Sequence, residues 1–359
     1  MAQPADYFQR IDLTDGDTVG DRAGDNVRED FMDAIYNIAP TQTPFMSGIG
    51  RGKSSDVYTS WQQDSLQEPQ SGNAAKDGAD LTSDSSMKAR RVGNINQISR
   101  KELIVTGRAD VVDKAGRGSE LSYQLAKASK ALKRDMEAIL TGNQTATPDA
   151  DGDTASLLGG LKASFRDPLA NETANVVPLG GGTVRAETTT VPTAATPGTP
   201  AAMTEAALKA AVEAAYMNGG EPDCIMLSPT NKTNLSTYLY TSSARVAAMY
   251  ADVGQSKGDG GAVAQSSVDV YISDFGALKI IPNRFLGYIT GTGVDNTSTY
   301  VLDMSMWATL YLRSFRTKNV ATTGDAEKRL LLVDYSLQNK EEMASALVMD
   351  VDHTAAMTA

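Results

Sequence analysis

The feature that most constrains the fold of this chain is a long polar stretch from Gln62 to Asn94, which joins two strand-like segments. The stretch consists mainly of Gly, Ser, Asp, Lys and Arg with almost no hydrophobic residues, so it cannot bury itself. Asp56–Trp61 alternates as a strand does, and Asn96–Val105 is the second strand candidate. We predict that these two strands form an arm-like hairpin that stands off the body and needs a partner surface.

The clearest helix is predicted over residues 119–141. Its apolar residues step by three and four and so share one face, while Gly142 and Asn143 end the helix. The apolar stripe consists of Leu121, Leu125, Ala128, Leu132, Met136, Ile139 and Leu140. A helix of this length is a rod of roughly 35 Å, and we expect the stripe to pack against a core.

The rest of the chain predicts a mixture of helices and strands. Asn26 could cap a short helix that ends at Pro40, and Thr204 could cap a helix closed by Gly219 and Gly220. Ser228 precedes a proline at a helix start that runs to about Leu239. Further strands are expected at 224–227, 268–272, 277–281, 300–302, 309–312, 330–337 and 346–351, with a hairpin turn over 273–276. The fold class is α+β.

Five segments are predicted to be loops or hinges. The Gly-, Thr- and Pro-rich runs 179–183 and 188–200 and the segment 252–261 are predicted to be flexible. Gly48–Ser54 resembles a phosphate-binding loop, but Ser47 occupies the place of the first glycine and no buried strand precedes it, so a flexible hinge is the better interpretation. Asp149–Asp153 spaces its carboxylates as a calcium loop does but lacks that loop's glycine and glutamate, which favours a solvated loop.

The composition argues against an enzyme. One cysteine, Cys224, and one histidine, His353, exclude an internal disulfide and a Cys/His zinc site, and leave little for a serine triad. Cys224 lies in an apolar run and is expected to be buried, whereas His353 is expected to face solvent. No catalytic residue, metal or cofactor is predicted. The sequence also shows no membrane span and no secretion signal, which indicates synthesis and folding in the cytosol.

Charge is unevenly distributed along the chain. The net charge is −11, which disfavours binding of nucleic acid over the general surface. Residues 1–33 carry nine acidic and three basic residues, and residues 88–117 carry eight basic and three acidic residues. Both runs are compatible with solvated faces; the sharper hypothesis is that acidic and basic segments of neighbouring subunits attract one another.

Several short motifs, in this order and spacing, resemble a subfamily of tailed-phage major head proteins. They are Ile38–Phe45, Trp61–Leu66, Gly93–Ile98, Leu132–Glu137, Asp274–Gly276 and Thr323–Lys328. The resemblance spans roughly residues 30–351, and the predicted element order agrees with the tailed-phage major capsid fold of the Hong Kong phage type. The resemblance says least about residues 170–203, whose position in the fold it does not assign.

The resemblance implies a domain plan. Residues 1–50 would form an N-terminal arm, and residues 51–105 an extended β-hairpin loop lying over a neighbouring subunit. Residues 106–203 and 300–359 would form a peripheral domain whose long spine helix is 119–141. Residues 204–299 would form an α/β axial domain that meets its symmetry mates at capsomer centres.

The function implied is that of a structural protein that assembles with itself, as hexamers and pentamers, into the icosahedral head shell around the double-stranded DNA genome of a bacteriophage. Portal, scaffold and decoration proteins are further candidate partners, and an acidic inner wall would let DNA slide. Such a protein would be made in the host bacterial cytoplasm and end in the virion. We hypothesise contacts between basic residues of the extended loop and acidic residues of the arm. The candidates are Lys88, Arg90, Arg91, Arg100 and Lys101 on one side, and Asp12, Asp15, Asp17 and Asp21 on the other.

Three alternatives remain at this stage. An encapsulin-like compartment would share the fold but enclose an enzyme, and the neighbouring genes would distinguish it. A cytosolic enzyme using carboxylates would show a ligand-dependent melting shift. A different virion protein, such as a tail or decoration component, is disfavoured by the long helix that follows a strand pair.

Overall fold

The computed structural model describes residues 42–64, 89–112, 118–149, 151–169, 172–241, 268–286, 298–322 and 324–358, together with short pieces between 66 and 80 and between 288 and 294. The predicted helix before Pro40 and the predicted loop 252–261 lie outside the described residues. No helix in the described part is long and apolar enough to cross a membrane.

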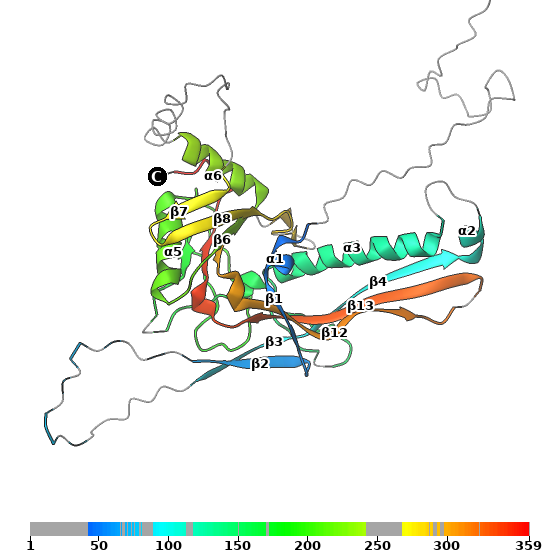
Figure 1. Ribbon diagram of the computed structural model, residues 1–359, viewed down its shortest axis with the longest axis horizontal. Coiled ribbons are helices and arrows are strands. Elements are labelled where there is room, and N and C mark those ends of the chain that lie inside the picture. The colour runs from blue at the N-terminus through cyan, green and yellow to red at the C-terminus, as the bar shows by residue number, and fades with distance from the viewer. Residues whose placement is uncertain are drawn as a thin grey trace, which may run out of the picture.

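A long four-stranded sheet forms one part of the molecule (Figure 1). Its strands, in spatial order, are β1 (Gly50–Lys53), β12 (Trp307–Asn319), β13 (Ala326–Asn339) and β4 (Gln97–Thr106). β1 is parallel to β12, and the other pairs are antiparallel. The predicted strands near 309–312 and 330–337 are confirmed, although both are longer than their apolar residues indicated.

The helix α3 (Glu120–Leu140) lies along this sheet and confirms the helix predicted over residues 119–141 (Figure 1). The Ser119 hydroxyl caps it by accepting a hydrogen bond from the Ser122 amide. Leu132, Met136 and Leu140 are fully buried in a cluster that also contains buried side chains of β13. Leu121 and Leu125, nearer the start of the helix, are only half-buried. The predicted apolar stripe is therefore covered mainly along its second half.

A six-stranded sheet forms the other part of the molecule. Its spatial order is β5 (Val176–Pro178), β14 (Ala346–Met349), β11 (Ser298–Leu302), β6 (Cys224–Leu227), β8 (Gly276–Pro282) and β7 (Val270–Ser273). Every residue of the three central strands β14, β11 and β6 is buried. β14 and β6 are short apolar runs without alternation because both of their faces are covered.

The predicted elements of this part are confirmed. α5 (Glu205–Met217) begins at Thr204, whose hydroxyl accepts from the Ala207 amide, and α6 (Pro229–Thr241) begins after Ser228, which accepts from Asn231. β7 and β8 form the predicted hairpin. Cys224 is 1% exposed, as predicted.

The domain plan needs a correction at residue 300. β11 and β14 pair with β6 and with each other in the six-stranded sheet, so the strands after Tyr300 do not return as one unit to the peripheral part. Only β12 and β13 do so. The reason is that β14 and the second half of β11, Tyr300–Leu302, are apolar and need cover on both faces, which an interior position in the six-stranded sheet provides.

The predicted pairing of the arm-like hairpin is also wrong. β2 (Tyr58–Gln63) pairs with β3 (Arg90–Ile95), a strand that the sequence pattern did not reveal, and not with the strand near residue 100. That strand is β4, which pairs with β13 in the body because Leu103 and Val105 bury one face of it. β3 was not predicted because its apolar pattern is interrupted by two arginines and a glycine, Arg90, Arg91 and Gly93.

The segment from 145 to 203 is packed rather than loosely attached, against expectation. Leu158, Leu161 and Phe165 are fully buried, the short helix α4 spans Leu161–Ser164, and β5 joins the six-stranded sheet. Its glycines allow close backbone approach: a Cβ on Gly180 would lie 1.7 Å from the carbonyl oxygen of Thr199. The glycines were read as flexible because the sequence alone does not show which backbone lies beside them.

The expected hinge at Gly48–Ser54 is likewise replaced by regular structure. α1 (Pro44–Gly48) is followed by β1, and Ile49 between them is 5% exposed. His353 is half-buried rather than solvent-facing. The remaining elements are α2 (Gly107–Val111), the 3-10 helices η1 (Met304–Met306) and η2 (Glu342–Ala344), and the short pair β9 (Tyr288–Ile289) and β10 (Gly293–Val294).

Candidate inter-subunit surfaces and their anchors

The β2–β3 hairpin is anchored to the body by buried amide side chains near its root. Asn94 donates from Nδ2 to the carbonyl oxygens of Gly159 (3.0 Å) and Leu337 (2.8 Å), and its Oδ1 accepts from the Gly159 amide (2.8 Å). Gln63 donates from Nε2 to the carbonyl oxygen of Lys340 at 3.0 Å. Both side chains are buried, so each lost hydrogen bond would leave an unpaired polar atom. These bonds fix the direction in which the hairpin leaves the body.

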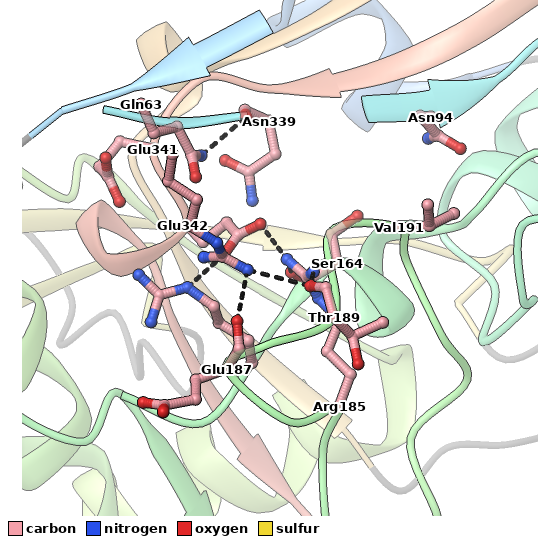
Figure 2. Close-up of polar contacts among 12 residues, drawn as sticks. Gln63, Asn94, Ser164, Arg185, Glu187, Thr189, Val191, Asn339, Glu341 and Glu342 are labelled. Atoms are coloured by element: carbon pink, nitrogen blue, oxygen red, sulfur yellow. Dashed lines mark hydrogen bonds and ion pairs between the residues drawn. The ribbon is translucent and has the colours of Figure 1, made fainter. Parts of the chain in front are cut away.

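A buried charge cluster around Glu342 and Arg185 lies beside this root (Figure 2). Arg90 of β3 belongs to it. Its centre is the carboxylate of Glu342 in η2, which is 1% exposed. Arg166 contacts Glu342 at 2.6 Å (Nε to Oε2), Arg185 donates to its Oε1, and Arg90 lies 3.4 Å from its Oε2. Three guanidinium groups from separate segments therefore share one carboxylate.

The guanidinium groups of the cluster have further partners. Arg166 makes a two-pronged ion pair with Glu172, at 2.7 and 2.8 Å. Arg90 donates to the carbonyl oxygens of Glu187 (2.8 Å) and Thr189 (2.9 Å). The cluster therefore connects the hairpin, the loop around Thr189 and η2 into one unit, which we call the root cluster: Arg90, Arg166, Arg185, Glu172 and Glu342.

Burial and pairing act against each other in the root cluster. Burial, together with repulsion from Arg90 and Arg166, lowers the pKa of Arg185, although Glu342 opposes the effect. Burial also disfavours the charged form of Arg166, but its contacts with Glu172 and Glu342 outweigh this and raise the pKa of Arg166. Both groups stay protonated at neutral pH because a guanidinium is not deprotonated in proteins. A buried ion pair adds little by itself, but loss of one partner leaves an uncompensated charge in a dry site.

A second buried carboxylate, Glu137 of α3, holds the segment that follows residue 41. Its two oxygens accept from the amides of Phe45 and Met46 in α1, both at 2.8 Å, and one also accepts from Asn283 Nδ2 at 2.7 Å. Glu137 is fully buried, and this burial raises its pKa although the three hydrogen bonds oppose the effect. The carboxylate satisfies the free amides at the start of α1 in place of a local cap.

The structure distributes the predicted contact residues over different environments. Arg90 belongs to the root cluster, whereas Arg91 is exposed and contacts only Ser60 Oγ among the described side chains. Arg100 pairs with Glu102 on the exposed face of β4, and Lys101 pairs with Asp135 of α3 at 2.5 Å. Lys88, Asp12, Asp15, Asp17 and Asp21 lie outside the described residues. The structure therefore does not bring the predicted basic residues together on the hairpin.

Sequence reasoning missed the most conspicuous charged residues. Glu342, Arg166 and Arg185 come from segments far apart in the chain, and nothing in their local sequence indicates that they meet. Glu137 carried a usable signal, because it follows Met136 directly within a helix whose apolar stripe includes Met136 and Leu140. A carboxylate on the border of a buried stripe must find donors, and here it finds them in α1.

Within the part of the chain that the structure describes, no group of three or more His, Cys, Asp or Glu residues could hold a metal ion. The Asp149 carboxylate accepts from the Gly152 amide at 2.7 Å, as in an ordinary turn. Burial raises the pKa of the Cys224 thiol, which keeps it protonated and unreactive.

Solved capsid structures share this fold. The chain is similar to the capsid of a native GTA particle (TM-score 0.56, 10% identity, covering 93% of this chain and 98% of that one). It is also similar to chains of Gordonia phage Cozz (TM-score 0.54, 12% identity, 90% and 91%) and Mycobacterium phage Ogopogo (TM-score 0.54, 16% identity, 90% and 96%). The fold is that of the tailed-phage major capsid proteins, as the motif order predicted.

The sequence places the chain more narrowly. A family model described as SU10 major capsid protein matches residues 12–352, and the chain belongs to this family. A curated relative, the major capsid protein of Escherichia phage Phieco32, is 37% identical over 118 residues, which is 33% of each chain. The aligned part thus spans about a third of that relative's length. The resemblance found from the short motifs is confirmed.

Proposed function

We propose that this protein assembles with copies of itself into the icosahedral head shell of a tailed phage, as rings of five and six subunits. The observation that carries the proposal is the family match over residues 12–352, in a chain whose fold agrees with solved capsids over nine-tenths of its length. A shell needs many repeated contacts between identical subunits, and such contacts propagate until curvature closes them.

The anchored hairpin supports this proposal. Its root is fixed by Asn94, Gln63 and the root cluster, while the polar chain beyond Gln63 has few hydrophobic residues with which to cover itself. A projection that is rigid at its base and polar along its length is suited to reach a neighbouring subunit. The predicted arm of residues 1–50 and the predicted meeting of the six-stranded parts at capsomer centres belong to the same proposal.

We further propose that the shell encloses double-stranded DNA without reading its sequence, and that the protein has no catalytic role. The net charge of −11 disfavours tight binding to phosphate. The buried, protonated Cys224 and the single histidine support the absence of catalysis. Portal, scaffold and decoration proteins are proposed as additional partners in the virion. Nuclease-protected DNA inside particles from infected cells would support a genome container, and an enzyme inside them would favour a compartment instead.

The assembly proposal is tested by expressing the full chain alone and examining it by size exclusion and negative-stain microscopy at low and moderate salt. Closed shells, or rings of five and six subunits, are the expected result. A monomer at every protein and salt concentration, persisting when the proteins of the same head gene cluster are co-expressed, would contradict it.

A further inference from the structure

We propose that the outer face of α3 binds the phosphate backbone of the enclosed DNA without reading its sequence. The inference rests on the proposed genome container and deepens it by naming the surface that contacts the genome. The surface consists of five positive residues, which we call the basic helix face: Lys127, Lys130, Lys133, Arg134 and Arg284.

Helical spacing turns the lysines of α3 away from the core. An α-helix turns by about 100° per residue, so residues three, four and seven apart share a face. Lys127, Lys130 and Arg134 have this spacing and lie on the side opposite the buried Leu132. Lys133 lies at the edge of the same face. The three lysines are exposed, so their ammonium groups are open to a partner.

Arg284 extends this face beyond the helix. The guanidinium of Arg134 lies over the ring of Phe285, 5.6 Å from its centroid, and Asn283 donates to the carboxylate of Glu137 at 2.7 Å. Both neighbours of Arg284 are thus fixed against α3, whereas Arg284 itself is exposed. Its positive charge is therefore added to the same side of the molecule.

The charges of the basic helix face are not neutralised within the described part of the subunit. None of its five residues forms an ion pair with another described residue. The nearby carboxylates of α3 are engaged elsewhere: Asp135 pairs with Lys101 of β4, and Glu137 accepts from the amides of α1. The net charge of −11 does not prevent a local contact, because exposed charges more than about 10 Å away are largely screened at about 0.1 M salt.

The character of this face favours phosphate over a protein partner. No large apolar side chain is exposed on α3, and small residues such as Ala126 and Ser129 stand between the lysines. The cores of protein interfaces are depleted in lysine and enriched in aromatic residues, whereas Lys and Arg make the contacts to DNA phosphates. A lysine-rich face without an apolar anchor is therefore suited to a polyanion.

The other side of the four-stranded sheet provides the contrast. Successive residues of a strand point to opposite sides, so Arg100 faces away from α3 because its neighbour Lys101 reaches α3. Arg316 lies in the same row as Arg100. Ile98 and Ile104 share the side of Arg100 and are 52% and 63% exposed. Charges mixed with exposed apolar side chains are typical of a surface that another protein covers.

The test is DNA binding by the unassembled, full-length subunit. A short fluorescent duplex of random sequence is titrated with protein at several salt concentrations, and its anisotropy is measured. K127E/K130E should raise the Kd by about tenfold or more and make the log–log salt dependence less steep by about two, since each lost phosphate contact contributes about 0.9. K127R/K130R keeps both charges and should bind as the wild type does.

The matched control is R316E/K318E, which lowers the net charge by the same amount on the other side of the sheet. It should change the Kd by less than about twofold, because its charges are remote from the DNA and screened. All these side chains except the half-buried remainder of the face are exposed, so thermal melts of the three variants should match the wild type. K127E/K130E should also form as many particles as the wild type.

Three outcomes would overturn the proposal. One is a wild-type subunit that does not bind the duplex even at low salt, and another is an equal loss of binding in K127E/K130E and R316E/K318E, which would reflect net charge alone. The third is a K127E/K130E variant that binds DNA normally but forms fewer particles, which would assign the face to an acidic protein segment. A wild-type chain that forms no particles with its head proteins would instead contradict the proposed function, whatever its affinity for DNA.

Discussion

Arginines of the root cluster and of the basic sheet face, which comprises Arg100 of β4 and Arg316 and Lys318 of β12, have opposite surroundings. In the root cluster, Arg166 and Arg185 are almost fully buried and share the carboxylate of Glu342 within one subunit. On the basic sheet face, Arg100 is 68% exposed and Arg316 is exposed as well. The comparison teaches that burial, and not position in a basic run, decides whether an arginine holds the fold together or remains available to another subunit.

The largest effect is expected when the root cluster loses its carboxylate. Glu342→Gln leaves three guanidinium groups around a neutral side chain, which should lower the free energy of unfolding by about 3–5 kcal/mol. Chemical denaturation of the unassembled subunit measures this. Glu327→Gln is the matched control, because Glu327 is 59% exposed in its pair with Arg329 and should cost less than about 1 kcal/mol. If Glu342→Gln and Glu327→Gln lowered the free energy of unfolding equally, the buried cluster would stabilise the fold no more than an exposed ion pair.

Neighbouring arginines of β3 sharpen the comparison within a single strand. Arg90→Ala should destabilise the subunit by about 1.5–3 kcal/mol, because it removes charge-assisted hydrogen bonds to Glu342 and to the carbonyl oxygens of Glu187 and Thr189. Arg91→Ala should change stability by less than about 0.5 kcal/mol. Thermal and urea unfolding of the two variants measures both stability changes, and equal changes would contradict this difference between Arg90 and Arg91. A test of hairpin contacts should therefore alter Arg91 alone, since a change at Arg90 disturbs the fold.

Glu137 provides a pH test of a buried carboxylate that is held by amides rather than by arginines. Glu137→Gln should cost about 1–3 kcal/mol, because one amide of α1 loses its acceptor. The folded-state pKa of Glu137 is raised, so the folded chain binds more protons than the unfolded chain between the ordinary and the raised pKa. Wild-type stability relative to Glu137→Gln should accordingly increase as pH falls through that window.

Urea denaturation of both proteins at neutral pH and at about pH 5 measures the difference, since all other carboxylates are common to both. A stability gap that narrows on acidification would show that hydrogen bonding, and not burial, dominates at Glu137. Asp135→Asn, which alters a 43% exposed carboxylate on the same helix, is the control.

The smallest effect on folding is expected on the basic sheet face. R316E/K318E should change the free energy of unfolding of the isolated subunit by less than about 0.5 kcal/mol, because both side chains are exposed. Thermal melts of wild type and variant measure this. A large loss would show that the face contributes to the fold of one subunit and is not reserved for a partner.

Much of the fold could be predicted because the relevant signals are local. The apolar spacing of Leu132, Met136 and Leu140, the caps at Ser119 and Thr204, and the apolar run of β6 each identify an element from residues within a few positions. Strand pairing could not be predicted in the same way. β3 was missed and β4 was assigned to the hairpin, because the alternation of Leu103 and Val105 shows a buried face but not the partner that buries it.

The anchors of the hairpin could not be predicted for a related reason. Glu342 meets Arg166 and Arg185 only after the chain has returned twice through the body, and no local pattern records that meeting. Asp350 shows the same limit: it has a positive φ of 63° and accepts from the amides of Gly182 and Gly198, both at 2.8 Å. The glycine-rich runs were predicted to be flexible because the sequence does not show that the Asp350 carboxylate binds their amides.

The central claim is that copies of this chain close into a shell through their surfaces. Electron cryomicroscopy of particles formed by the full chain tests it most directly. The account predicts a closed icosahedral shell built from copies of this chain, with Arg90 still bound to Glu342 inside each subunit. Particles without icosahedral order, or a chain that stays monomeric in the presence of its head proteins, would contradict it.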